Sequence, residues 1–180
     1  MNIVAISGSL RKDSFNTALL HAFQESTPAD MKIEIVSIAE LPMYSGDIEA
    51  PYPAAAQTLR NAIEKADGLI IATPEYNRSM SGALKNAIDW LTRPSGTNSF
   101  SRKPVLVAGV SNGKRGAVVA QSQLRQVLTH LNANVIGQPE LNLGPASEIF
   151  GVDGSMTDAP TRESLVKALD ALRERVAGSV

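Results

Sequence analysis

The loop at residues 8–16 has the residue types of an anion-binding site. Ser9, Ser14 and Asn16 offer side-chain hydrogen bonds. Arg11 adds a guanidinium group that can pair two phosphate oxygens at once. A helical pattern begins inside the loop, and the unpaired amides and dipole at a helix start favour negative charge. The open alternative is an ordinary strand-to-helix turn with local capping.

The spacing of this loop narrows the kind of anion. It matches neither G-x-G-x-x-G nor G-x-x-x-x-G-K-[ST], which disfavours a dinucleotide fingerprint and a Walker A loop. A compact loop of serine, asparagine and arginine suits a monophosphate better than a pyrophosphate. Asp13 is discordant, and we expect it to point away from a bound phosphate or to cap the helix.

A second polar loop, Pro74–Asn77, follows the apolar run Gly68–Thr73. Its backbone amides and the side chain of Asn77 can meet the polar edge of a heterocycle, and Tyr76 can cover or flank a flat ring. The competing interpretation makes Tyr76 a half-buried packing residue and Glu75 an exposed charge. In the helical segment that follows, we expect Lys85 and Asp89 to pair at i, i+4. We expect Trp90 to pack in a core or an interface.

A third stretch, Gly109–Gly113, matches the nucleophile-elbow pattern G-x-S-x-G. A serine hydrolase of this type would need an acidic residue after Ser111 and then a histidine base, in that order along the chain. His130 is the only histidine after Ser111, and it falls inside the next helical segment, whereas His21 precedes it. A serine esterase that uses Ser111 is therefore a remote alternative.

Apolar runs of strand length alternate with helical spacing along the whole chain. The predicted strands are Asn2–Ser7, Lys32–Val36, Gly68–Thr73, Pro104–Val110 and Ala133–Ile136. The predicted helices are Phe15–Phe23, Ala54–Ile63, and the segments with stripes at Leu84–Leu91, Leu124–Leu131 and Leu165–Val176. This order indicates a parallel sheet whose strands are buried on both faces by helices.

Right-handed crossovers leave few topologies for such a chain. Five strands and five helices best fit a flavodoxin-like three-layer sandwich, an α/β fold with a five-stranded parallel sheet of order 2-1-3-4-5. That order places the loops after Ser7 and Thr73 side by side, with the loop after Val110 as the next neighbour. A monophosphate site beside a flat-ring site suggests FMN.

Composition restricts the class of protein. The chain has 180 residues, which fits a single domain over residues 1–180, and a formal net charge of −1, which argues against nucleic acid as a partner. It has no cysteine, which excludes disulfides and thiol catalysis. No secretion signal precedes the first strand, and the longest apolar run, Pro104–Val110, is too short to span a bilayer. We therefore expect a cytoplasmic protein with no membrane partner.

The segment Asn142–Pro160 is rich in Gly, Pro, Ser and Asp and has no clear period. This predicts a surface loop before the last helix. Its acidic residues Glu148, Asp153 and Asp158 lack the spacing of an EF-hand loop, so we expect no metal site.

The segments Gly8–Asn16 and Pro74–Trp90 together resemble the two signature stretches of the NAD(P)H-dependent FMN reductase family. The similarity is greatest to the bacterial chromate, quinone and azo-dye reductases, and it runs from the first strand through Glu140. It implies FMN as cofactor and NADPH or NADH as electron donor. It also implies a small-molecule electron acceptor and a homodimer or homotetramer.

The resemblance carries cofactor roles onto three loops. In the family the first loop binds the FMN phosphate, the second contacts the isoalloxazine, and a third, after the fourth strand, touches the flavin from the other side. The implied phosphate residues are Ser9, Leu10, Arg11, Ser14, Phe15 and Asn16. The implied ring contacts are Pro74, Glu75, Tyr76 and Asn77, with Ser111 and Gly113 in the third loop. No catalytic side chain is implied, because the flavin supplies the redox chemistry.

The chain departs from the family pattern at a few positions. Ser81 stands where relatives usually carry Pro, and Arg78 where they often carry Tyr. Val119 replaces a common Arg, and Ala117 a Gly beside it. The predicted function is an FMN-dependent NAD(P)H oxidoreductase with a ping-pong mechanism, acting on quinones, azo dyes, chromate or free flavin. The alternative is a flavodoxin-type electron carrier, although such carriers are usually markedly acidic.

Overall fold

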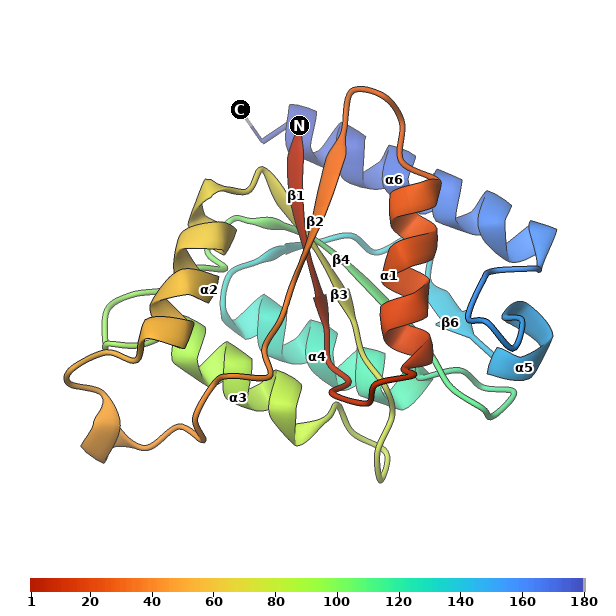
Figure 1. Ribbon diagram of the computed structural model, residues 1–180. Coiled ribbons are helices and arrows are strands. Elements are labelled where there is room, and N and C mark those ends of the chain that lie inside the picture. Colours follow the sequence, from red (N-terminus) through yellow and green to blue (C-terminus); the bar gives the residue numbers. More distant parts are fainter. Residues whose placement is uncertain (180) are drawn as a thin grey trace.

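The computed structural model describes residues 1–179 as a parallel sheet with helices on both faces (Figure 1). Val180, the last residue of the predicted domain 1–180, lies outside the described residues. The strands are β1 (Asn2–Ser7), β2 (Lys32–Val36), β3 (Gly68–Ala72), β4 (Pro104–Val110), β5 (Asn134–Val135) and β6 (Leu141–Leu143). The helices are α1 (Phe15–Glu25), α2 (Ala54–Lys65), α3 (Gly82–Leu91), α4 (Val118–His130), α5 (Ala146–Ile149) and α6 (Ala159–Ala177), with a 3-10 turn, η1, at Gly46–Ile48.

The strand order is β2-β1-β3-β4-β5, and every pairing is parallel. This confirms the predicted order. The register aligns Ser7 with Ala72 and Ala72 with Ala108, so β1, β3 and β4 end at the same edge of the sheet. The loops that follow these three strands are therefore neighbours, and Figure 1 shows them together at the lower edge.

The fifth position of the sheet differs from the single predicted strand Ala133–Ile136. Two short strands share it: β5 pairs with the start of β4, and β6 pairs with its end at Ala108–Val110. Pro139 lies between them, and proline has no N–H to donate to a ladder. The sheet therefore has six strands, although it keeps five positions.

Successive side chains of the buried strands pack into two separate cores, one on each face of the sheet. Ile70 of β3 packs in the core beneath α1 and α6, and its neighbour Ile71 packs in the core beneath α2, α3 and α4. Both faces of β3 and β4 are covered, and each of their residues is buried. Continuous apolar runs are therefore the pattern these strands need.

The prediction of a surface loop over Asn142–Pro160 was wrong. The segment includes the end of β6 and all of α5, and it buries Ile149, Phe150 and Met156 in the core. The ring of Phe150 stacks on Phe15 of α1, with 5.8 Å between centroids. These apolar residues are isolated in sequence because they pack against distant helices and need no period of their own.

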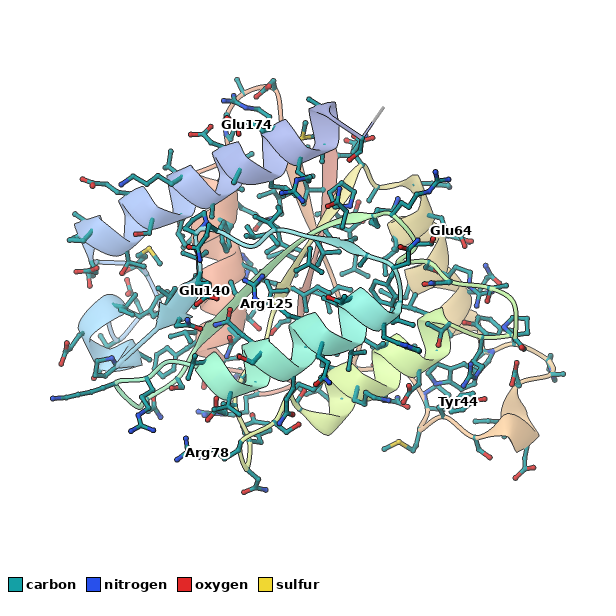
Figure 2. All side chains as sticks on the ribbon, turned by 180° about the vertical axis from the view of Figure 1, so that it is seen from behind. Tyr44, Glu64, Arg78, Arg125, Glu140 and Glu174 are labelled. Carbon is teal, nitrogen blue, oxygen red and sulfur yellow. The ribbon has the colours of Figure 1, made fainter. Side chains whose placement is uncertain are left out.

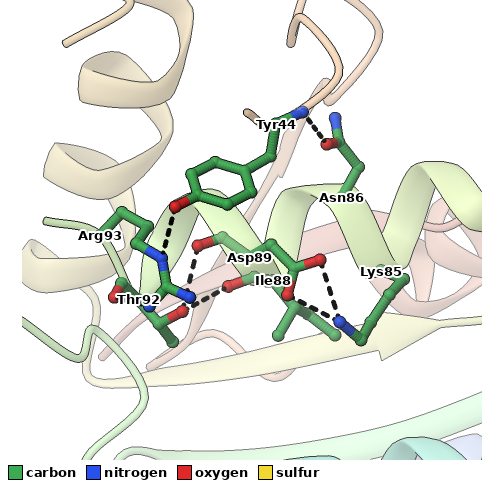
Figure 3. Close-up of polar contacts among 7 residues, drawn as sticks. All are labelled: Tyr44, Lys85, Asn86, Ile88, Asp89, Thr92 and Arg93. Carbon is green, nitrogen blue, oxygen red and sulfur yellow. Dashed lines mark hydrogen bonds and ion pairs between the residues drawn. The ribbon is translucent and has the colours of Figure 1, made fainter. Parts of the chain in front are cut away.

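The segment before η1 crosses α3 and is fastened to it by hydrogen bonds (Figure 3). The amide of Tyr44 donates to Asn86 Oδ1 at 2.8 Å, and Arg93 Nε donates to the Tyr44 hydroxyl at 2.8 Å. Lys85 and Asp89 form the predicted pair on the same helix, at 2.7 Å. Trp90 is fully buried, as a core residue should be. Among the helices of residues 1–179, none is long and apolar enough to cross a membrane.

Candidate functional site

A cavity of about 320 Å³ lies where the loops after β1, β3 and β4 meet. Its walls come from all three loops, as the strand order requires. Residues of the first loop in the walls are Ser9, Arg11, Ser14, Phe15 and Asn16. The second loop contributes Pro74, Glu75 and Tyr76, and the third contributes Val110, Ser111, Asn112 and Gly113.

The first loop presents hydrogen-bond donors to this cavity. Ser14 caps α1 by accepting hydrogen bonds from the amides of Asn16 and Thr17, which leaves its hydroxyl proton available. Within residues 1–179, the amide of Phe15 donates to no protein acceptor, and Arg11 has no carboxylate partner. These donors and the guanidinium group match the requirements of a phosphate monoester.

Asn16 braces the site. Its Nδ2 donates to the Val110 carbonyl and its Oδ1 accepts from the Val110 amide, each at 3.1 Å. The side chain therefore joins the start of α1 to the end of β4, and it is 3% exposed. The structure shows this bracing contact, whereas a contact from Asn16 to a phosphate stays a prediction.

Ser81 joins the first loop to the second. Its hydroxyl donates to the carbonyl of Gly8 and accepts from the amide of Leu84, so one buried side chain caps α3 and ties it to the first loop. A Cβ atom at Gly8 would lie 3.2 Å from Pro74 Cδ, so the loops also approach closely. Ser81 was recognised in the sequence only as a departure from the family pattern.

The second loop ends in a tight hairpin. Tyr76 and Ser79 exchange two backbone hydrogen bonds, at 2.9 and 3.0 Å. The two residues between them, Asn77 and Arg78, have φ values of 51° and 63°, as a two-residue type I′ turn requires. The turn carries Asn77 outside the cavity walls, whereas Tyr76, 46% exposed, lines them.

The carboxylate of Glu75 fixes the base of this hairpin to α4. Its Oε2 accepts hydrogen bonds from the amides of Val119 and Ala120, at 2.9 and 3.2 Å. Ala117, the residue before the helix, offers no side-chain cap, so Glu75 supplies one from another part of the chain. Arg78 lies 3.8 Å from the other Glu75 oxygen, with 67% of its side chain exposed at the outer end of the hairpin (Figure 2).

The third loop is held by backbone contacts. The Ser111 amide donates to Leu143 of β6, and the Ser111 carbonyl accepts from Ala146 of α5. A Cβ at Gly144 would overlap the carbonyl oxygen of Gly113, so glycine is needed where the two segments meet. The Ser111 hydroxyl contacts only the backbone of Gly113 among the described residues.

A serine nucleophile would need a histidine close by. His130 ends α4, twelve residues beyond its start and about 18 Å along the axis, since an α-helix rises 1.5 Å per residue. The other histidine, His21, bonds Gln24 on α1. Residues 1–179 also hold no group of three or more His, Asp or Glu residues that could bind a metal ion.

The structure thus gathers ten of the twelve predicted cofactor residues around one cavity. Leu10 is 56% exposed and, like Asn77, lies outside the walls, so its flavin contact stays a prediction. Sequence reasoning missed Val110 and Asn112 as wall residues. The available signal was the position of Asn112 between Ser111 and Gly113, two predicted cofactor residues.

Comparison with known proteins adds an independent observation. A model of the NADPH-dependent FMN reductase family matches residues 1–148. The 2-hydroxy-1,4-benzoquinone reductase of a Burkholderia species is 40% identical over 170 residues, which cover 94% of this chain and 93% of the relative. The quinone reductase of Escherichia coli K12 is 38% identical over 178 residues, which cover 97% and 94%.

A solved structure has the same fold. FerB of Paracoccus denitrificans, a flavoenzyme NAD(P)H:(acceptor) oxidoreductase, superposes with a TM-score of 0.91 at 37% identity and covers 98% of this chain and 97% of its own. The fold and the family match therefore define a flavodoxin-like oxidoreductase. The chain belongs to the NADPH-dependent FMN reductase family, with FMN and NAD(P)H as its cofactors. The predicted family, fold class, enzyme class and cofactors are confirmed.

Proposed function

We propose that this protein binds FMN in the three-loop cavity and catalyses electron transfer from NAD(P)H to quinones. The observation that carries the proposal is the convergence of an anion-binding loop and a polar, tyrosine-bearing hairpin on one cavity. The phosphate would rest on the donors of the first loop, namely Ser9, Ser14 and Arg11. The ring would lie against Pro74–Tyr76, with Ser111 and Gly113 on its other side.

The residues fit this cofactor chemically. The first loop supplies neutral and cationic donors at the start of α1, where the helix dipole also favours an anion. Glu75 is the acidic residue in the cavity walls, and its Oε2 is directed to the amides of α4. The end of the cavity proposed for the phosphate is therefore cationic. The Glu75 carboxylate is held by its hydrogen bonds to α4.

When bound, FMN supplies the redox chemistry, in which a hydride from NAD(P)H is followed by electron transfer to an acceptor that occupies the same place. This exchange of ligands predicts ping-pong kinetics. The chain's own residues bind the phosphate, orient the ring and exclude water from one of its faces. Tyr76 and Asn77 would shape the entrance to the ring, and Arg78 would add a positive charge there. No nucleophile or acid–base pair is needed, so we assign no catalytic side chain.

A quinone is the acceptor class that the relatives support, because several of them are quinone reductases. Azo dyes, chromate and free flavin are further acceptors that the same chemistry allows. From the family resemblance we also propose a homodimer or homotetramer. From the sequence pattern we propose a cytoplasmic protein with a single domain over residues 1–180.

The experiment is steady-state oxidation of NADPH by the FMN-loaded protein with a soluble benzoquinone. We expect turnover that follows parallel-line, ping-pong kinetics as both substrates are varied. A flavodoxin-type electron carrier would bind FMN but would not oxidise NADPH under these conditions, so that result would favour the carrier. A protein that cannot be loaded with FMN would overturn both functions.

A further inference from the structure

One side chain of α4, Gln123, holds the tip of the hairpin that lines the cavity. Its Nε2 donates to the Arg78 carbonyl at 2.9 Å, and its Oε1 accepts from the Ser79 hydroxyl at 2.6 Å. Both the nitrogen and the oxygen of the Gln123 side-chain amide thus bond the same turn. Together with the Glu75 carboxylate, which caps α4, these contacts fasten the hairpin to the helix at its base and at its tip.

The hairpin needs such a restraint. Asn77 and Arg78 are both in the left-handed region; asparagine is common at the first position of such a turn, but the second usually holds glycine, so the strain lies at Arg78. The side chains of Asn77 and Arg78 are exposed, and the ion pair between Arg78 and Glu75, at 3.8 Å, is long and open to solvent. Backbone conformations of this kind persist only where the surroundings fix them, and Gln123 contacts the residues at the end of the turn.

We propose that Gln123 is a positioning residue for flavin binding, acting on the ring through the hairpin that carries Tyr76. The proposal rests on the proposed function, because it takes Pro74–Tyr76 to be the ring-binding segment. Without Gln123 the hairpin would sample other conformations in the free protein. Binding would then have to order it, and that ordering cost would reduce the affinity for the ring.

This role predicts a particular thermodynamic pattern. Gln123 acts at the ring end, whereas Arg11 acts at the phosphate end of the cavity. Riboflavin has the ring of FMN but no phosphate. Loss of Gln123 should therefore lower the affinities for riboflavin and for FMN by the same factor, whereas loss of Arg11 should lower the affinity for FMN alone. The two variants should therefore give different patterns, an equal loss for both flavins in one and a loss for FMN alone in the other.

The test is to titrate flavin-free protein with riboflavin and with FMN, using flavin fluorescence. For Gln123→Ala we expect both dissociation constants to rise about five- to tenfold, the effect of losing one or two neutral hydrogen bonds. Ser79→Ala removes only the 2.6 Å contact and should give a smaller rise of the same kind. Gln126→Ala is the matched control, since Gln126 is exposed on the same helix and lines a different groove, and it should change neither constant.

A second measurement separates positioning from folding. The visible circular dichroism of bound FMN should change in Gln123→Ala and stay unchanged in Gln126→Ala. If Gln123→Ala binds riboflavin and FMN as tightly as the unaltered protein, the inference is wrong while the proposed function stands. If Gln123→Ala does not fold, Ser79→Ala decides by the same criterion. Failure of the unaltered protein to bind either flavin would overturn the proposed function itself.

Discussion

The replacement Asn16→Ala tests whether the first loop is braced as the structure shows. The Asn16 side chain satisfies both the amide and the carbonyl of Val110, which is 2% exposed. Its removal would leave two buried backbone groups without partners, each costing about 1–3 kcal/mol. Water from the adjoining cavity can reach part of this region, so we expect a net loss of about 2–4 kcal/mol in the free energy of unfolding.

The assay is urea and thermal unfolding of the flavin-free protein, followed by circular dichroism. For a chain of this size the expected loss lowers the melting temperature by roughly 5–15 °C. Asn112→Ala is the matched control, because Asn112 is an exposed asparagine in the walls of the same cavity. A loss below about 0.5 kcal/mol for Asn16→Ala would show that Val110 finds other partners, and the bracing role would be refuted.

Three further predictions concern separate contacts. Arg11→Ala should weaken FMN by about 10- to 150-fold, the value of a charge-assisted hydrogen bond, and leave riboflavin unchanged in the same titration; an equal effect on both flavins would contradict the phosphate assignment. Ser81→Ala removes a helix cap and the bond to the Gly8 carbonyl, so urea unfolding should show a loss of about 1–2 kcal/mol, and an unaltered midpoint would contradict the link between the loops. Hydrogen bonds from the side chain and the amide of Thr161 lower the pKa of Asp158, so the stabilising effect of the Asp158 carboxylate is present at neutral pH and is lost as the pH falls through that pKa. The advantage of the unaltered protein over Asp158→Ala in urea midpoint should therefore shrink between pH 7 and roughly pH 3, and a constant difference would refute the charge effect.

The order of the main strands could be predicted because a strand that is buried on both faces is a continuous apolar run in the sequence. Gly68–Ala72 and Pro104–Val110 are continuous apolar runs, and each is a central strand. The broken fifth position could not be predicted, because β5 and β6 have only two and three residues and depend on pairing with β4. For the same reason, the buried residues of 142–160 have no sequence period: distant helices determine their burial.

The site was predictable to the level of its loops. Strand order alone brings the loops after β1, β3 and β4 together, and the residue types then indicate which end would bind an anion. The contacts that hold the loops were not predictable, since they join residues far apart in the chain. Asn16 and Val110 are 94 positions apart, Gly8 and Ser81 are 73 apart, and Arg78 and Gln123 are 45 apart. A single sequence carries no signal for such pairs.

The central claim is that FMN occupies the cavity formed by the three loops. A crystal structure of the protein with FMN tests it most directly. We predict the phosphate on the first loop, within hydrogen-bond distance of Ser9, Ser14 or Arg11, and the ring against Tyr76. Flavin bound elsewhere on the protein, or bound here with the phosphate at the hairpin and the ring at the first loop, would contradict it.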